Sequence, residues 1–214
     1  MHTPFSVMRC MTIVKHSVAL VMTLVLLLLF SGAQAGRSSA VDVVASFHDA
    51  LIHAMKNGDN LGFHGRYQFL APVIEGSFDL PFMTVKSVGR SWKDFQDDQR
   101  TLLLETYKQW SVSTYAKRFN SHAGESFSPP SVADASTRTV TVTSTLTVAD
   151  DEPIVFSYKL REKEAQWRIV DIHVKGVSRL ALTRSQFIAL LQKEGFEGLI
   201  ANLKKKIRDA SEET

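Results

Sequence analysis

The sequence predicts an α+β domain in which helices cover one face of an antiparallel sheet. Apolar residues recur at helical spacing through much of residues 41–119, apolar and polar residues alternate between residues 138 and 174, and helical spacing returns at residue 183. Helices followed by strands and then by further helices are typical of this class. Because neither a repeat nor a linker divides the chain, we expect one domain over residues 36–214.

The first half of this domain is expected to be helical. The predicted stretches cover residues 41–57, 63–74, 91–95 and 97–119. Pro81 marks another helix start, because proline is well tolerated in a first helical turn. Asp97 or Asp98 is the expected N-terminal cap of the longest helix. An apolar, aromatic side of that helix comprises Leu103, Tyr107, Trp110 and Tyr115.

Three antiparallel strands are expected next, over residues 138–148, 154–160 and 167–174. Strict alternation in the first strand, interrupted by Ser144, indicates one buried face and a threonine-rich face toward water. Asp150 and Asp151 are turn candidates. The side chains predicted to face the helices are Val140, Val142, Leu146, Phe156, Tyr158, Val170, Ile172 and Val174.

Two helices are expected to end the domain. Residues 183–191 and 196–207 show helical spacing, and Gly195 separates them.

The first 35 residues have the three-part pattern of a secretory signal peptide. Arg9 and Lys15 precede an apolar run over residues 18–30, and an Ala-x-Ala site ends at Ala35. The alternative is a membrane anchor, although a bilayer span needs about 20 apolar residues. We therefore expect an exported domain that begins at Gly36.

Composition excludes several classes of function for the exported domain. Of the 25 basic residues, Arg9 and Lys15 lie in the leader, which leaves 23 against 22 acidic residues. A nearly neutral domain offers no electrostatic case for nucleic-acid binding. Cys10, the only cysteine, also lies in the leader. No disulfide, thiol nucleophile or thiolate metal site is therefore expected.

Polar side chains form no recognisable catalytic or metal-binding motif. His48 and His53 stand five residues apart on a predicted helix, which is not the spacing of a metal-binding pair, and we interpret them as surface or rim residues. Asp171 and His173 share a strand face, but no third catalytic member is marked, and we interpret them as solvated. Without a phosphate loop or nucleophile elbow, we expect no enzyme.

Lys204, Lys205 and Lys206 are interpreted as a solvated helix face, with contact to an anionic membrane or a partner as the alternative.

The apolar residues have two interpretations. Eleven of the 13 phenylalanines remain after the leader, with Phe5 and Phe30 removed. Phe63, Phe69, Phe78 and Phe82 fall in stretches expected to cover the sheet. They either fill a core or line an apolar cavity, because core and cavity wall share one composition.

Several strings together resemble the MlaC (toluene-tolerance) family. Residues 66–74 read RYQFLAPVI, and residues 78–83 read FDLPFM. The resemblance continues through residues 89–93, 99–100, 114–119, 167–171, 176–178 and 184–187. It therefore covers nearly the whole predicted domain, in order.

This resemblance implies a periplasmic carrier that holds lipid tails between a curved antiparallel sheet and helices, in a cone-shaped, NTF2-like fold enclosing an apolar cavity. It implies no cofactor and no catalytic residue. The implied partners are phospholipid, an inner-membrane ABC transporter complex with an MCE-domain subunit, and an outer-membrane lipoprotein complex. The expected lipid-binding residues are Phe78, Phe82, Met83, Val142, Phe156, Tyr158, Ile172, Val174 and Phe187. The Tyr158 hydroxyl is expected near the cavity mouth.

Residues 47–51, 78–83 and 114–119 look most like the hopanoid-associated HpnM branch, which makes a hopanoid an alternative cargo. Lys175 and the pair Leu182–Thr183 depart from the family pattern at the junction between strand and helix. Two other functions stay open: a small hydrolase or isomerase using Asp171 and His173, and a structural envelope protein with a filled core.

Overall fold

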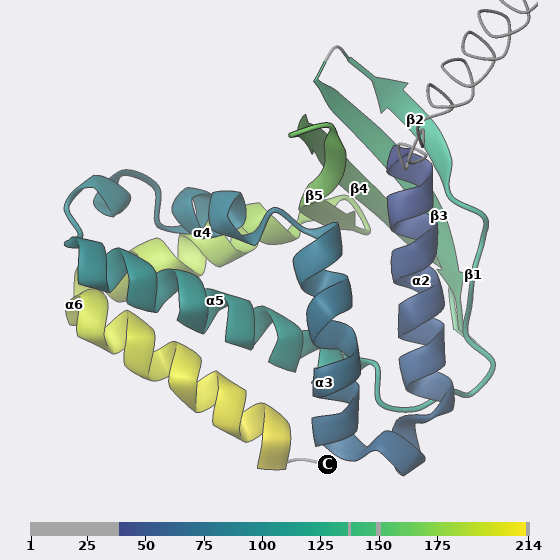
Figure 1. Cartoon of the computed structure of the whole chain (residues 1–214), viewed down its shortest axis with the longest axis horizontal. Helices are drawn as coiled ribbons and strands as arrows, with labels where there is room; N and C mark the ends of the chain where they lie inside the picture. Colours follow the sequence, from purple (N-terminus) through teal and green to yellow (C-terminus); the bar gives the residue numbers. More distant parts are fainter. Residues whose placement is uncertain (1–38, 137, 149–150, 213–214) are drawn as a thin grey trace, which may run out of the picture. The chain divides into compact units, whose positions relative to one another are not determined.

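Helices and strands follow the predicted order in the computed structural model (Figure 1), which describes residues 39–136, 138–148 and 151–212. The helices are α2 (Ala40–Lys56), α3 (Gly58–Ser77), α4 (Leu80–Val88), η1 (Gly89–Lys93), α5 (Asp97–Arg118) and α6 (Arg179–Glu212). The strands are β1 (Ser126–Phe127), β2 (Ser131–Ala135), β3 (Thr139–Thr147), β4 (Ile154–Lys163), β5 (Gln166–Val174) and β6 (Val177–Ser178). The expected leader and Asp150 of the expected turn lie outside the described residues.

Local sequence explains where the helices begin. Ser39 caps α2: its Oγ accepts a hydrogen bond from the Asp42 N–H at 3.1 Å, and the Asp42 carboxylate accepts one from the Ser39 N–H at 2.8 Å. The prediction of an aspartate cap for α5 is wrong by one residue. The cap is Gln96, because the Gln99 side chain reaches back to accept from the Gln96 N–H at 3.0 Å.

Two glycines kink long helices. Gly62 in α3 has φ +56°, and Gly195 in α6 has φ +69°. Both values lie in the left-handed region that glycine adopts without steric cost. Gly195 divides α6 at the predicted position, whereas α3 begins five residues before the predicted helix and bends at Gly62.

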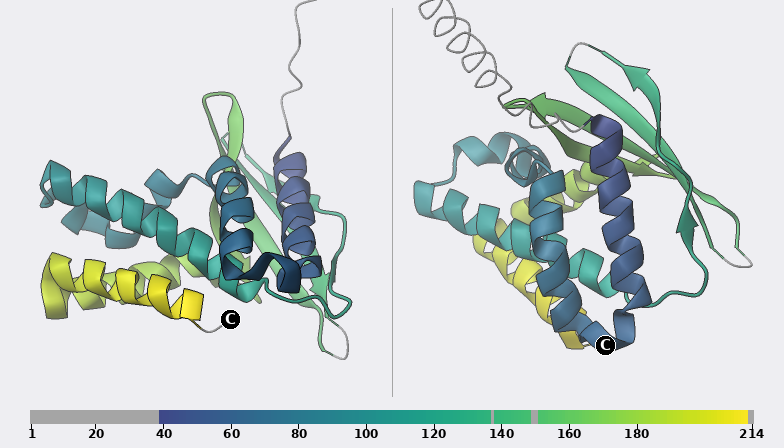
Figure 2. Two further views of the ribbon diagram at one scale, coloured as in Figure 1. Left: turned by 60° about the horizontal axis from the view of Figure 1, so that its bottom comes forward. Right: turned by 45° about the vertical axis from the view of Figure 1, so that its right-hand side comes forward.

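The strands form an antiparallel sheet in the order β1-β3-β4-β5-β6, and β2 also pairs with β3. The expected meander is its centre, because β3 pairs with β4 and β4 with β5. The short strands β1, β2 and β6 were not anticipated, since two to five residues carry little periodicity. The sheet curves across α2 and α3 (Figures 1 and 2).

The faces of β3 and β4 are as predicted, but those of β5 need a correction. Val142, Ser144 and Leu146 are buried, while the threonines between them are half-exposed. The Ser144 hydroxyl donates to the Ser128 carbonyl at 2.7 Å, which explains the polar interruption. In β5, a register shift leaves Ile169, not Val170, opposite Leu160 and within the main core.

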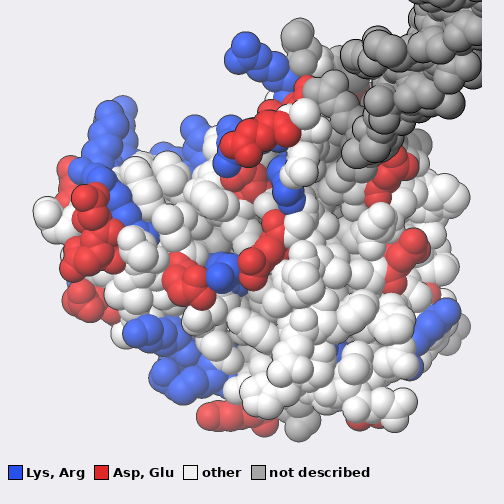
Figure 3. Space-filling view, in the orientation of Figure 1, with Lys and Arg blue, Asp and Glu red and all other residues white. Residues whose placement is uncertain are grey.

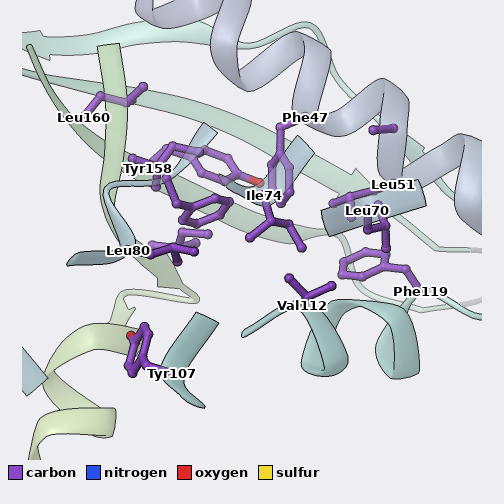
Figure 4. Close-up of a cluster of buried hydrophobic side chains, with 14 of the residues drawn as sticks. Phe47, Leu51, Leu70, Ile74, Leu80, Tyr107, Val112, Phe119, Tyr158 and Leu160 are labelled. Atoms are coloured by element: carbon purple, nitrogen blue, oxygen red, sulfur yellow. The ribbon is translucent and has the colours of Figure 1, made fainter. Parts of the chain in front are cut away.

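All the long helices pack on one side of the sheet. Helix α2 contacts β3 and β5, and α3, α4 and α6 each contact β5, while α5 lies between α3 and α6. The core between these layers combines residues from both (Figure 4). The α+β prediction, with helices over one face of a curved sheet, is confirmed. None of the described helices is both long and apolar enough to span a bilayer.

Candidate functional site: an apolar cavity between sheet and helices

An apolar cavity of about 200 Å³ lies between the sheet and the helices. Its sheet side is formed by Phe156, Ile172 and Val174. Its helical side is formed by the end of α3, by α4, by one face of α5 and by the first two turns of α6. The lining residues from these helices and the junction after α3 are Ile74, Phe78, Leu80, Met83, Tyr107, Trp110, Ser111, Thr114, Tyr115, Arg118, Phe119, Arg179, Leu180, Leu182, Thr183 and Gln186.

Aromatic residues behind the wall hold the lining rings in place. Phe187 is buried, and its ring centroid lies 5.6 Å from that of Trp110 and 6.1 Å from that of Tyr107. Phe47 on α2 contacts Tyr115 edge to face at 5.4 Å. Edge-to-face aromatic packing of this kind stabilises one ring orientation. The wall is therefore backed by a packed core on its helical side.

The charged residues of the lining are exposed, and they mark the mouth of the cavity. Arg118 ends α5, Arg179 begins α6, and both side chains are exposed. Burial raises the pKa of the Tyr115 phenol, while the two nearby guanidinium groups act in the opposite direction. Leu182, at 41% exposure, adds an apolar residue to the same rim.

Asp171 and His173 are placed differently from the sequence interpretation. Asp171 is only 9% exposed, and its carboxylate accepts hydrogen bonds from the Ser178 hydroxyl at 2.6 Å and from the Leu180 N–H at 3.0 Å. His173 Nε2 lies 3.1 Å from the same carboxylate. Because the Ser178 hydroxyl donates to Asp171 and not to His173, the histidine is not positioned to take its proton. The cluster anchors the start of α6 beside the mouth.

His48 is not a surface residue. It is 4% exposed, its ring stacks on Phe127 with centroids 3.9 Å apart, and its Nε2 lies 2.8 Å from the Tyr158 hydroxyl oxygen. Burial lowers the His48 pKa to about 4. The expectation that the Tyr158 hydroxyl lies near the mouth is therefore wrong, because this buried phenol takes His48 as its partner. His53 is exposed, as expected.

Five of the nine expected lipid-binding residues line the cavity: Phe78, Met83, Phe156, Ile172 and Val174. The other four lie outside the lining. Val142 has no exposed surface and belongs to the core, and Tyr158 and Phe187 are buried behind the wall. Phe82 is on another side of α4, where the Arg161 guanidinium lies 4.1 Å from its ring centroid. Alternation identifies a strand face but not how far along it the cavity extends.

Sequence reasoning did not assign the α5 and α6 contributions to the site. A signal was present for α5, because Tyr107, Trp110 and Tyr115 already marked an aromatic helix side. No comparable signal marked Arg118 and Arg179, whose proximity depends on how two helix ends meet. Among the described residues, no cluster of three His, Cys, Asp or Glu side chains is placed to bind a metal.

Comparison with known proteins gives a family and a fold. The model of the MlaC protein family matches residues 45–205. A solved structure of a phospholipid-binding protein from Ralstonia solanacearum, in complex with a phospholipid, superposes with a TM-score of 0.72 at 20% sequence identity. The superposition covers 82% of this chain and all of the Ralstonia chain. No curated protein matches the chain.

Proposed function

The chain belongs to the MlaC family, and from this premise we propose that it is a lipid carrier whose cavity holds phospholipid tails. The observation that carries the proposal is the apolar cavity, which combines aromatic and aliphatic walls with one polar mouth. Each CH₂ group removed from water contributes about 0.8 kcal/mol, so tails in this cavity avoid a large cost of exposure. The phospholipid bound to the Ralstonia protein supports the same cargo.

We further propose that the carrier works in the periplasm. The pattern of residues 1–35 supports export. Family membership supports a shuttle between an outer-membrane lipoprotein complex and an inner-membrane MCE-domain ABC transporter. Such a shuttle needs a binding cavity but no catalytic group. This agrees with the role of Asp171, whose hydrogen bonds to Ser178 and Leu180 hold the start of α6.

The proposed cargo requires the cavity to widen. Its volume of about 200 Å³ is below the roughly 300–1,000 Å³ of pockets that hold drug-sized ligands. A phospholipid with two tails therefore enters only if wall side chains move apart. The α6 residues of the wall are exposed or half-buried, whereas Ile74, Phe78 and Ile172 are buried. The opening is therefore expected on the α6 side.

Two matched substitutions separate a cavity from a filled core. Val174 lines the cavity and is half-buried, whereas Val142 has no exposed surface and lines no part of it. Val174→Asp is expected to fold and to copurify with several-fold less lipid, because water entering from the mouth can hydrate its carboxylate. Val142→Asp is expected to unfold or to melt on the order of 10 °C lower, since an unpaired buried charge costs several kcal/mol.

Thermal unfolding and mass spectrometry of extracted lipid measure both effects. Wild-type amounts of lipid in a folded Val174→Asp protein would contradict the assignment of this cavity as the lipid site. A hopanoid in the wild-type extract would change the cargo and support the HpnM-like alternative, whereas a phospholipid would support the proposal as stated.

A further inference from the structure

The charges at the cavity mouth are all of one sign. Among the 19 residues that line the cavity, Arg118 and Arg179 are positively charged and none is acidic. Within the described part of the chain, neither guanidinium makes a salt bridge. Arginine presents a planar array of donors that matches phosphate geometry, so two unpaired arginines at one opening favour an anionic group.

Among the described residues, the groups around the two arginines pair with neither guanidinium. Tyr115, one helical turn before Arg118, lies close enough to both guanidinium groups for their charges to act on its phenol. Asp171, on the adjoining strand, accepts from the Ser178 hydroxyl and the Leu180 N–H and lies beside His173, so its hydrogen bonds go to these groups and not to the arginines. The other polar residues of the lining, Ser111, Thr114, Thr183 and Gln186, are neutral.

We propose that Arg118 and Arg179 hold the phosphate of the bound phospholipid at the mouth, and that the protein consequently prefers lipids with a net negative headgroup. This inference rests on the proposed lipid-carrier function. A zwitterionic headgroup brings an ammonium group beside its phosphate, and the lining offers no carboxylate to receive it. A phosphatidylglycerol headgroup brings neutral hydroxyls instead, and the side chains of Thr183 and Gln186 can form hydrogen bonds with hydroxyl groups.

Loading from mixed vesicles tests this preference. The full chain is expressed, and its soluble form is incubated with vesicles of equimolar phosphatidylglycerol and phosphatidylethanolamine with identical acyl chains, in buffer without phosphate. After reisolation, mass spectrometry gives the ratio of the two lipids and the total lipid per chain. We expect wild-type protein to be enriched about threefold in phosphatidylglycerol, an effect of the size expected for exposed charge pairs.

The variant Arg118→Gln/Arg179→Gln is expected to carry the same total lipid at the ratio of the vesicles. Its matched control is Arg90→Gln/Lys204→Gln, which removes two exposed charges that do not line the cavity. Figure 3 shows basic side chains over the C-terminal part of α6, the segment that contains Lys204. This control is expected to keep the wild-type ratio.

The outcomes distinguish the headgroup site from the carrier function. Equal lipid ratios in wild-type protein and the double arginine variant, with lipid bound to both, would overturn the headgroup site alone. Failure of every protein to take up lipid would overturn the carrier function. Titration of lipid-free protein with inorganic phosphate tests whether the arginines bind a free anion instead of a lipid headgroup. Phosphate binding that depends on the arginines, without a preference among lipids, would assign the site to a free anion and contradict the proposal.

Discussion

At the scale of single residues, the buried pair His48–Tyr158 links α2 to the centre of the sheet. Their hydrogen bond of 2.8 Å joins α2 to β4. The ring of Phe127, in β1, stacks on the same histidine. The His48 Nδ1 finds no hydrogen-bond partner among the residues that the structure describes. Its environment therefore suits a neutral imidazole and opposes a charged one.

This environment predicts a specific acid sensitivity. His48 has a pKa of about 4 when folded and 6.5 as an ordinary histidine, so the unfolded chain binds a proton first as the pH falls. The contribution of neutral His48 to the free energy of unfolding is therefore fully present above pH 6.5. It is lost progressively as the pH falls from 6.5 to 4. With about 1.4 kcal/mol for each pKa unit, the expected loss is about 3 kcal/mol.

Urea unfolding at pH 7 and pH 4.5 measures this loss. The control is His48→Phe/Tyr158→Phe, which removes the titrating group and its hydroxyl partner together while keeping both rings. Carboxylates contribute to the loss of stability in both proteins, so the difference between the two losses gives the contribution of His48. An equal loss of stability in wild type and control would show that His48 is not the acid-sensitive group.

At the scale of elements, Arg66 joins the start of α3 to the end of α5. The side chain is 2% exposed, and it donates to the Ala116 carbonyl through Nε and to the Gly58 carbonyl through Nη1, each at 2.8 Å. A cation at the last turn of α5 also interacts favourably with the helix dipole. Gly58 permits this junction, because a Cβ there would lie 1.8 Å from the Asn120 carbonyl oxygen.

Gly58→Ala is therefore expected to destabilise the protein by about 2 kcal/mol, as overpacking against backbone does. For a chain of this size the melting temperature should fall by roughly 4–8 °C. Gly76→Ala is the matched control, because its Cβ would meet only Arg168 Nη1 at 3.9 Å on an exposed turn of α3. Similar melting temperatures for the two variants would contradict the close packing of Gly58 against the Asn120 carbonyl group.

Helices and strands were predictable from the sequence wherever the pattern of neighbouring residues determines them. The alternation in β3 and the break at Gly195 depend on neighbouring residues alone, and the structure agrees with both. The bulge at Val170 was not predictable, because it depends on the register of β5 against β4. His48 was misplaced for a similar reason: β1 and β4 bury it, and neither strand is near it in sequence.

At the scale of the whole molecule, the residue pattern left a filled core and a cavity open, the family resemblance implied a cavity between the layers, and the expected residues cover only part of its wall. Residues from the sheet side, such as Ile172 and Val174, followed from strand alternation. The helical side required knowledge of which faces of α5 and α6 meet, so Trp110 and Arg179 were not assigned to the site. Phe82 was assigned from the apolar string that contains it, although its ring packs under Arg161.

The central claim is that this cavity carries a phospholipid, and native mass spectrometry of the purified wild-type protein tests it most directly. We expect a population of chains whose mass exceeds that of the polypeptide by one phospholipid, which collisional activation releases as a species with two acyl chains. Protein that has only the polypeptide mass, both as purified and after incubation with phospholipid vesicles, would contradict the claim.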